Sequence, residues 1–170
     1  MTIGDENAKV TVIEYASFTC PHCAHFHDTV YGQIKANYID TGKVKFVMRD
    51  VYFDRFGLWA AQIARCDGKA KFFGMSDLIY SKQREWLAGG DPAVIVENLR
   101  KLGRIAGMDN DKMTACLQDD QMIENLVKAF QDNTTKDEIN STPSFIIDGT
   151  KYSNMSYDDF AKVLDAELAK

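Results

Sequence analysis

The segment from Lys9 to Tyr38 constrains the fold more than any other part of the chain. KVTVIEYASF (Lys9–Phe18) is rich in β-branched and aromatic residues and predicts a strand. A helix should follow, because Pro21 suits a first helical turn and Cys20 then occupies the cap position. Apolar residues recur at helical spacing as far as Tyr38. Gly32 interrupts this pattern and predicts a weak point or kink in the helix.

The remaining elements predict one α/β domain with a helical insertion. KVKFVMRDV, beginning at Lys43, predicts a second strand, and residues 57–133 predict a long helical region. PSFIIDGTKYS then predicts a hairpin turning at Asp148–Gly149, and Ser156–Asp159 predicts a capping box for a last helix ending near Leu168. We therefore expect a β-α-β half and a β-β-α half, residues 1–56 and 134–170, around an all-helical insertion, 57–133.

The CPHC motif, Cys20 to Cys23, gives the two sulfurs different expected properties. Free amide hydrogens and the helix dipole should stabilise a thiolate at Cys20 and lower its pKa. His22 adds a positive charge or a hydrogen bond beside it. Cys23 lies one turn inside the helix and should be more buried. A stabilised thiolate is a good leaving group, so a Cys20–Cys23 disulfide should be readily passed to another thiol.

Composition narrows the classes of protein further. The chain has 170 residues, 45% of them apolar, which is enough for a sizeable core. The net charge is −5 and no basic stripe is visible, so we expect no nucleic-acid partner. No apolar run approaches the ~20 residues of a membrane span. Trp59 and Trp86 are expected in the core, whereas Tyr52 and Phe53 are candidates for lining a peptide groove.

A metal site is the alternative use of so many ligand residues in FTCPHCAHFH. His25 and His27, together with the two cysteines, offer zinc or copper ligands. No second CxxC or HxxxH pair completes a tetrahedral set, so we expect neither a metal nor another cofactor. On the helical pattern, His27 is expected to be a partly buried packing residue and His25 to face solvent.

The chain resembles the DsbA-like thiol oxidoreductases of the thioredoxin superfamily. VIEYASFTCPHC (Val12–Cys23), the helical insertion and STPSFIIDG (Ser141–Gly149) carry this resemblance. It implies a thioredoxin fold and a periplasmic enzyme that oxidises cysteines in newly exported, unfolded proteins. It also implies reoxidation by a DsbB-like membrane oxidase. The sequence begins with Met1 and TIGDENAKVTV and shows no signal peptide, so Met1 is either a cytosolic start or stands where a signal was removed; the periplasmic location expected from the resemblance requires the second.

The resemblance also assigns residues. Thr142–Pro143 should be a cis-proline element that faces CPHC and holds an extended substrate. Glu14 alternates with Val10 and Val12 and should point into the core, where the resemblance implies an acid that exchanges a proton with Cys23. A second cysteine pair in some relatives implies a structural Cys66–Cys116 disulfide. Its loop of about 50 residues would stabilise the fold by roughly 4 kcal/mol.

Two other functions stay open on the sequence. A periplasmic reductase or isomerase of the same superfamily would use the same residues. Isomerases usually add an N-terminal dimerisation domain, and the first strand here begins near Lys9, so a monomer is favoured. A Cys/His metal-binding protein is the alternative from a different class.

Overall fold

A computed structural model describes residues 1–170, in which five strands form one mixed sheet. The strand order is β1-β3-β2-β4-β5. The central pair β2·β3 is parallel, whereas β1·β3, β2·β4 and β4·β5 are antiparallel. Their bounds are β1 Thr2–Ile3, β2 Val10–Ala16, β3 Val44–Asp50, β4 Ser144–Ile147 and β5 Thr150–Ser153. The short strand β1 was not predicted, because two residues show no periodicity.

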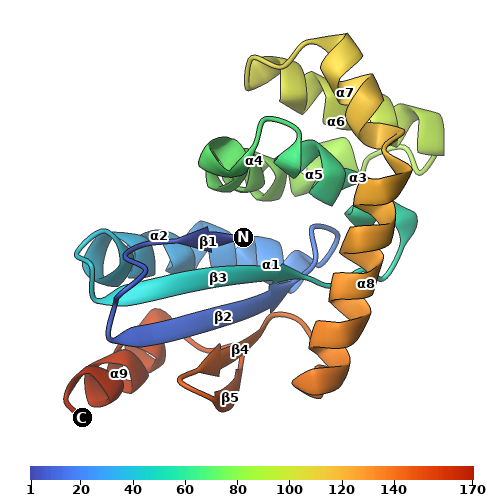
Figure 1. Ribbon diagram of the computed structural model, residues 1–170. Coiled ribbons are helices and arrows are strands. Elements are labelled where there is room, and N and C mark those ends of the chain that lie inside the picture. The colour runs from blue at the N-terminus through green and yellow to red at the C-terminus, as the bar shows by residue number, and fades with distance from the viewer.

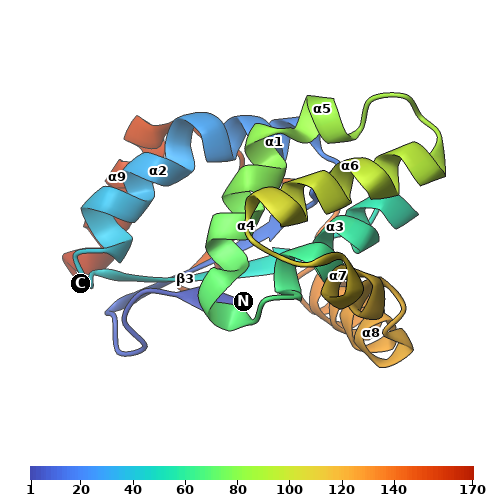
Figure 2. The ribbon, with the colours of Figure 1, turned by 90° about the horizontal axis from the view of Figure 1, so that it is seen from above.

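One face of the sheet carries most of the core. Val10, Val12 and Glu14 alternate along β2 onto this face and are buried, whereas Thr11 and Ile13 on the other face are only half-buried. The helix after β2 and the last helix, α9 (Tyr157–Leu168), lie side by side over the buried face (Figures 1 and 2). Their contact includes the rings of Phe26 and Phe160, 6.0 Å apart, and a 3.0 Å hydrogen bond from Tyr38 to Asp165.

The helix after β2 is continuous but contains two π-helical turns. It consists of α1 Pro21–Phe26, η1 His27–Tyr31, α2 Gly32–Ile34 and η2 Lys35–Ile39. The sequence predicted a weak point or kink at Gly32, and the structure has a π turn on each side of this residue. Gly32 itself keeps helical backbone angles (φ −59°, ψ −36°). π turns insert one extra residue into a helical turn and are frequent at functional sites.

Helices fill the chain between β3 and β4, as the sequence predicts. They run from Arg55 to Lys136, slightly beyond the expected limits of 57 and 133. Aspartates cap four of them: Asp54, Asp91, Asp109 and Asp119 each accept a backbone amide hydrogen bond. The six helices are α3 Arg55–Arg65, α4 Lys69–Ser81, α5 Gln83–Trp86, α6 Pro92–Ile105, α7 Asn110–Leu117 and α8 Asp120–Lys136. None of the helices is long and apolar enough to cross a membrane.

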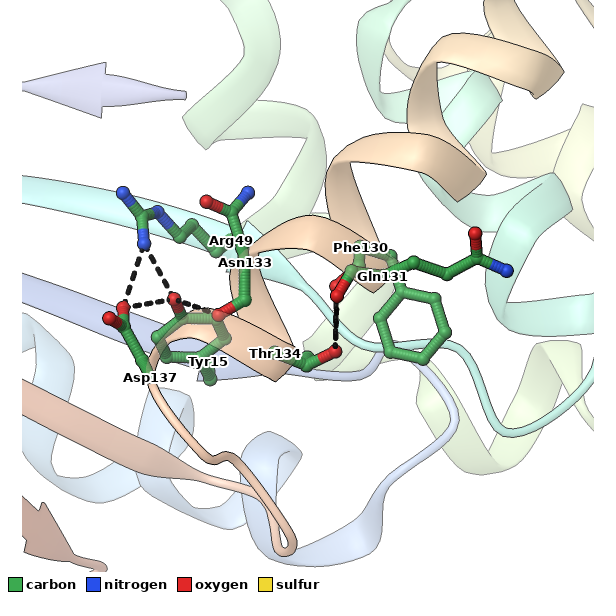
Figure 3. Close-up of polar contacts among 7 residues, drawn as sticks. All are labelled: Tyr15, Arg49, Phe130, Gln131, Asn133, Thr134 and Asp137. Atoms are coloured by element: carbon green, nitrogen blue, oxygen red, sulfur yellow. Dashed lines mark hydrogen bonds and ion pairs between the residues drawn. The ribbon is translucent and has the colours of Figure 1, made fainter.

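The long helix α8 runs from this helical region back to the sheet (Figure 1). A cluster at its C-terminal end fixes it there (Figure 3). Tyr15 of β2 donates to Asp137 (2.5 Å), and its hydroxyl oxygen also lies 3.1 Å from the Asn133 carbonyl oxygen. Arg49 of β3 pairs with Asp137 at 2.9 Å. Burial and the hydrogen bond to Asp137 raise the pKa of Tyr15 to about 12, so its hydroxyl stays protonated at neutral pH. The helical region and the sheet therefore share a fixed junction.

The turn and cap expected in the last part of the chain are confirmed. Asp148 and Gly149 form the two-residue turn between β4 and β5, both with positive φ (43° and 86°). This combination is that of a type I′ hairpin turn, in which glycine avoids the strain of a side chain. Ser156 caps α9 by accepting from the Asp159 amide.

Candidate active site

The CPHC motif lies at the junction of the sheet and the helical region. Cys20 is the N-cap of α1 and Pro21 its first residue, as the sequence predicts. Gln83 of α5 donates from its side chain to the carbonyl oxygens of Phe18 and Cys20, at 2.8 and 2.9 Å. Thr19 donates to Asp54, the cap of α3, at 3.0 Å. The loop before Cys20 is thus held from two helices of the insertion.

The sulfur of Cys20 is surrounded by hydrogen-bond donors. The Cys23 thiol, the Thr142 side chain and the backbone amides of Cys23 and His22 bond to it. These hydrogen bonds, chiefly that from Cys23, outweigh burial and lower the pKa of Cys20 to about 5. Cys20 is therefore a thiolate at neutral pH, which is the form that attacks disulfides and leaves from them.

Cys23 has the opposite character. It is 0% exposed, whereas Cys20, although largely buried, is 7% exposed, so Cys20 is the more accessible of the two cysteines. Burial, the hydrogen bond to Cys20 and the nearby charge of Glu14 raise the pKa of Cys23. Cys23 therefore holds its proton when the pair is reduced.

Thr142 and Pro143 face Cys20 from the start of β4. Their peptide bond is cis, and Pro143 is buried. The Thr142 carbonyl oxygen lies 3.5 Å from the Cys20 sulfur. The structure thus brings together the Thr-Pro element and CPHC, which lie far apart in the sequence.

Glu14 lies beneath the two cysteines and pairs with His27. Glu14 is 0% exposed, and both of its carboxylate oxygens lie 3.1 Å from Nε2 of His27. Burial alone would lower the pKa of His27, but the charges of Glu14 and Asp77 raise it to about 9. Glu14 lies in the core, as the sequence predicts. The prediction that His27 is only a packing residue is incomplete, because His27 also pairs with Glu14. The one available signal was that His27 lies four residues after Cys23, on the same helical face.

The other candidate residues are placed as follows. The side chain of His22 is exposed and makes no hydrogen bond, so in this structure His22 acts on Cys20 only through its backbone amide. His25 is exposed. Phe53 is 62% exposed, and Tyr52 is half-buried against Phe130, with ring centroids 5.4 Å apart.

The second cysteine pair lies away from this site. Cys66 and Cys116 form a disulfide that joins the end of α3 to α7. No three side chains of His, Cys, Asp or Glu are grouped so that they could hold a metal ion.

The fold and the site together define a thioredoxin-fold dithiol protein. A β-α-β half and a β-β-α half carry an accessible thiolate, a buried thiol and a cis-proline at one edge of the sheet. The chain belongs to the thioredoxin family, whose model matches residues 1–166. The expected fold, with its helical insertion, is thereby confirmed.

Individual relatives narrow the likeness to DsbA-like proteins. Wolbachia pipientis alpha-DsbA1 has a crystal structure that is 26% identical, with a TM-score of 0.91, covering 99% of this chain and 90% of that one. Disulfide bond formation protein D of Bacillus subtilis is 26% identical over 98% of this chain and 76% of its own length. The resemblance noted in the sequence is therefore confirmed.

Longer relatives show that such sequences also occur within larger proteins. A putative protein-disulfide oxidoreductase of Rickettsia bellii is 32% identical over 169 residues, which is 99% of this chain but 64% of the relative. A second, from Rickettsia typhi, is 31% identical over 99% of this chain and 62% of its own length. The chain thus spans less than two thirds of these curated relatives.

Proposed function

We propose that this protein is a thiol:disulfide oxidoreductase that donates a Cys20–Cys23 disulfide to cysteines of newly exported, unfolded proteins. The observation that carries the proposal is the opposite shift of the two thiols: the pKa of Cys20 falls to about 5, and that of Cys23 rises. The Cys20 sulfur is thereby a good leaving group, and the Cys23 sulfur resolves the mixed disulfide when no second substrate thiol attacks it.

The exchange proceeds in two displacements. A substrate thiolate attacks the Cys20 sulfur, the Cys20–Cys23 bond breaks, and Cys23 takes the electron pair and one proton. A second substrate thiolate then attacks the substrate sulfur of the mixed disulfide, and Cys20 leaves as a thiolate. The substrate loses two electrons and the protein gains them. Each unit by which the pKa of Cys20 is lowered favours the reduced protein by up to ~1.4 kcal/mol, or ~30 mV.

The substrate is an extended chain held along Thr142–Pro143. The 3.5 Å distance from the Thr142 carbonyl to Cys20 supports this site, because a strand bound there brings its own sulfur against Cys20. Phe53 extends the surface, since it is exposed and precedes Asp54, which binds the neighbouring Thr19. Backbone contacts dominate, so we expect little selectivity for substrate sequence.

A membrane oxidase resembling DsbB reoxidises the protein, which works as a monomer outside the cytoplasm. Continued turnover requires an electron acceptor, because each substrate disulfide leaves Cys20 and Cys23 reduced. The Cys66–Cys116 disulfide supports an oxidising compartment, since such bonds are rare in reducing ones.

The reduction potential tests this proposal. The Cys66→Ala/Cys116→Ala variant is equilibrated with glutathione buffers, trapped with acid and alkylated, and the fraction of Cys20–Cys23 disulfide is counted by mass. We expect a potential well above that of thioredoxin, about −270 mV. A value at or below that of thioredoxin would favour the reductase. A Cys23→Ala variant whose Cys20 has first been converted to a mixed disulfide with glutathione should accumulate a Cys20–substrate disulfide with an unfolded substrate that carries one thiol, releasing glutathione, whereas Cys20→Ala should not.

A further inference from the structure

A cavity borders His27, the partner of the buried Glu14. Its volume is about 220 Å³, and it lies between the first helix and α4. Three residues that line it, His27, Tyr31 and Tyr80, each carry a buried polar atom without a hydrogen-bond partner in the protein. These atoms are Nδ1 of His27 and the hydroxyl oxygens of the two tyrosines. Unpaired buried polar groups around a cavity of this size indicate ordered water.

His27 connects this cavity to the active-site cysteines. Its Nε2 contacts Glu14 at 3.1 Å, and the charge of Glu14 acts on Cys23. On the other side of the ring, Nδ1 lies 3.8 Å from a carboxylate oxygen of Asp77, too far for a direct hydrogen bond but within reach through water. The side chain of Asp77 is 51% exposed, so it reaches solvent.

The charged and titratable groups around His27 favour its role as a proton carrier. The ring is stacked on Tyr80 of α4, with centroids 4.2 Å apart, and is 3% exposed. The sheet contributes Glu14, α4 contributes Asp77 and Tyr80, and the first helix contributes Cys23, Tyr31, Asp28 and Lys35. The raised pKa of His27, about 9, means that it carries a proton at neutral pH.

We propose that His27, Asp77 and the cavity between them form a proton path that connects solvent to Glu14 and Cys23 during disulfide exchange. When the Cys20–Cys23 bond breaks, Cys23 leaves as a buried thiolate. His27, which is protonated on both ring nitrogens, passes its Nε2 proton to Glu14, and Glu14 passes it to Cys23, so the ring is left neutral with its proton on Nδ1. Nε2 then regains one proton, supplied from solvent through the cavity water at Asp77. Reoxidation moves the proton outward along the same groups. This path rests on the proposed function and makes His27 a proton carrier that acts on Cys23 through Glu14.

The test measures the rate of single-turnover reduction of the oxidised protein by excess dithiothreitol between pH 6.5 and a pH above 9. This range covers the ordinary pKa of histidine, 6.5, and the pKa of His27 in the folded protein, about 9. His27→Phe should be about tenfold slower than wild type at pH 6.5, a modest loss for a general acid. The two rates should converge above pH 9, where wild-type His27 is itself deprotonated. Asp77→Asn should be about threefold slower, with the same trend. His25→Phe, which removes the exposed histidine of the same helix, should match wild type.

Three results would overturn the path. A rate ratio of His27→Phe to wild type that is constant with pH would mean that His27 only packs. The absence of recovery when imidazole is added to His27→Ala would mean the same, because a small proton carrier should restore part of the rate. Wild-type behaviour of Asp77→Asn, an exposed position that should fold normally, would remove the outlet to solvent.

Failure of this path is distinguishable from failure of the proposed function. If wild-type protein oxidises a dithiol peptide but His27→Phe reacts like wild type at every pH, the path alone is wrong. If wild-type protein does not oxidise the peptide while the pH dependence with dithiothreitol appears as expected, the path stands and the oxidase function is wrong.

Discussion

The hydrogen bond between the two active-site sulfurs makes each cysteine depend on the other. Donation from the Cys23 thiol is the largest cause of the lowered pKa of Cys20, and acceptance by Cys20 helps to raise that of Cys23. Replacing either residue therefore alters the chemistry of the one that remains.

We predict that Cys23→Ala raises the pKa of Cys20 from about 5 partway towards 9, the value of an ordinary thiol. Cys23→Ser should raise it less, because a hydroxyl still donates to the sulfur. Thiolate absorbance, followed against pH with both variants in the reduced state, measures this. Equal pKa values in Cys23→Ala and wild type would show that the backbone amides alone stabilise the thiolate.

The pair of His27 and Glu14 should make stability depend on pH. The pKa of His27 is about 9 in the folded protein against 6.5 when unfolded, so the protonated histidine favours the fold. This contribution is complete below pH 6.5 and disappears as the pH rises through 9. We expect a loss of up to about 3 kcal/mol in the free energy of unfolding across that window.

Urea unfolding of the oxidised protein measures this effect, because Cys20 and Cys23 then do not titrate. Glu14→Gln should flatten the dependence, since the neutral amide no longer favours the histidine cation. His25→Gln, which removes an exposed histidine, should leave it unchanged. An unchanged slope in Glu14→Gln would assign the pH dependence to other groups.

At the scale of the elements, α5 braces the loop that precedes the active site. Gln83 is buried and satisfies the carbonyl oxygens of Phe18 and Cys20. A short helix of the insertion thus fixes the backbone on which the nucleophile is mounted.

We predict that Gln83→Met destabilises the protein by about 1–3 kcal/mol, because buried carbonyl oxygens lose their donor. Gln121→Met on the exposed surface of α8 should change stability by less than about 0.5 kcal/mol. The urea unfolding midpoints of wild type, Gln83→Met and Gln121→Met measure these changes in stability. The rate of Cys20 alkylation should also change in Gln83→Met, whereas a stability loss with unaltered alkylation would limit Gln83 to a structural role.

Local signals in the sequence predicted most of the elements but not the contacts between them. Pro21, Asp91 and Ser156 mark helix starts through chemistry that acts within one turn, and each lies where expected. Gln83 has no such signal, because its partners lie 63 and 65 residues away. The same holds for His27, whose helical spacing fits a packing residue as well as an ion pair.

For the whole molecule, the redox state of the site should shift global stability. The pKa of Cys20 is lowered from 9 to about 5 by folding, so the thiolate favours the fold. This contribution is complete above pH 9 and is lost as the pH falls through 5. The oxidised protein instead gains roughly 2 kcal/mol from closing a very small loop.

We therefore predict that the reduced form is the more stable at about pH 8 and the oxidised form at about pH 5, each by roughly 1–2 kcal/mol after solvent screening. Urea unfolding of both redox forms should be measured in the Cys66→Ala/Cys116→Ala background. That background removes a disulfide closing a loop of 50 residues, whose reduction would otherwise obscure the comparison. A higher midpoint of the oxidised form at both pH values would contradict the thiolate argument.

The position of the insertion sets the order in which the site is completed during synthesis. Thr11 and Asp148 are hydrogen-bonded across 137 residues, and β4 occupies one side of β2. Cys20 and Cys23 thus leave the ribosome long before Thr142 and Pro143 exist. Until then the edge of β2 that pairs with β4 is unpaired, and the CPHC motif lacks the Thr142–Pro143 element that faces it. A nascent or truncated chain has both cysteines but an incomplete active site.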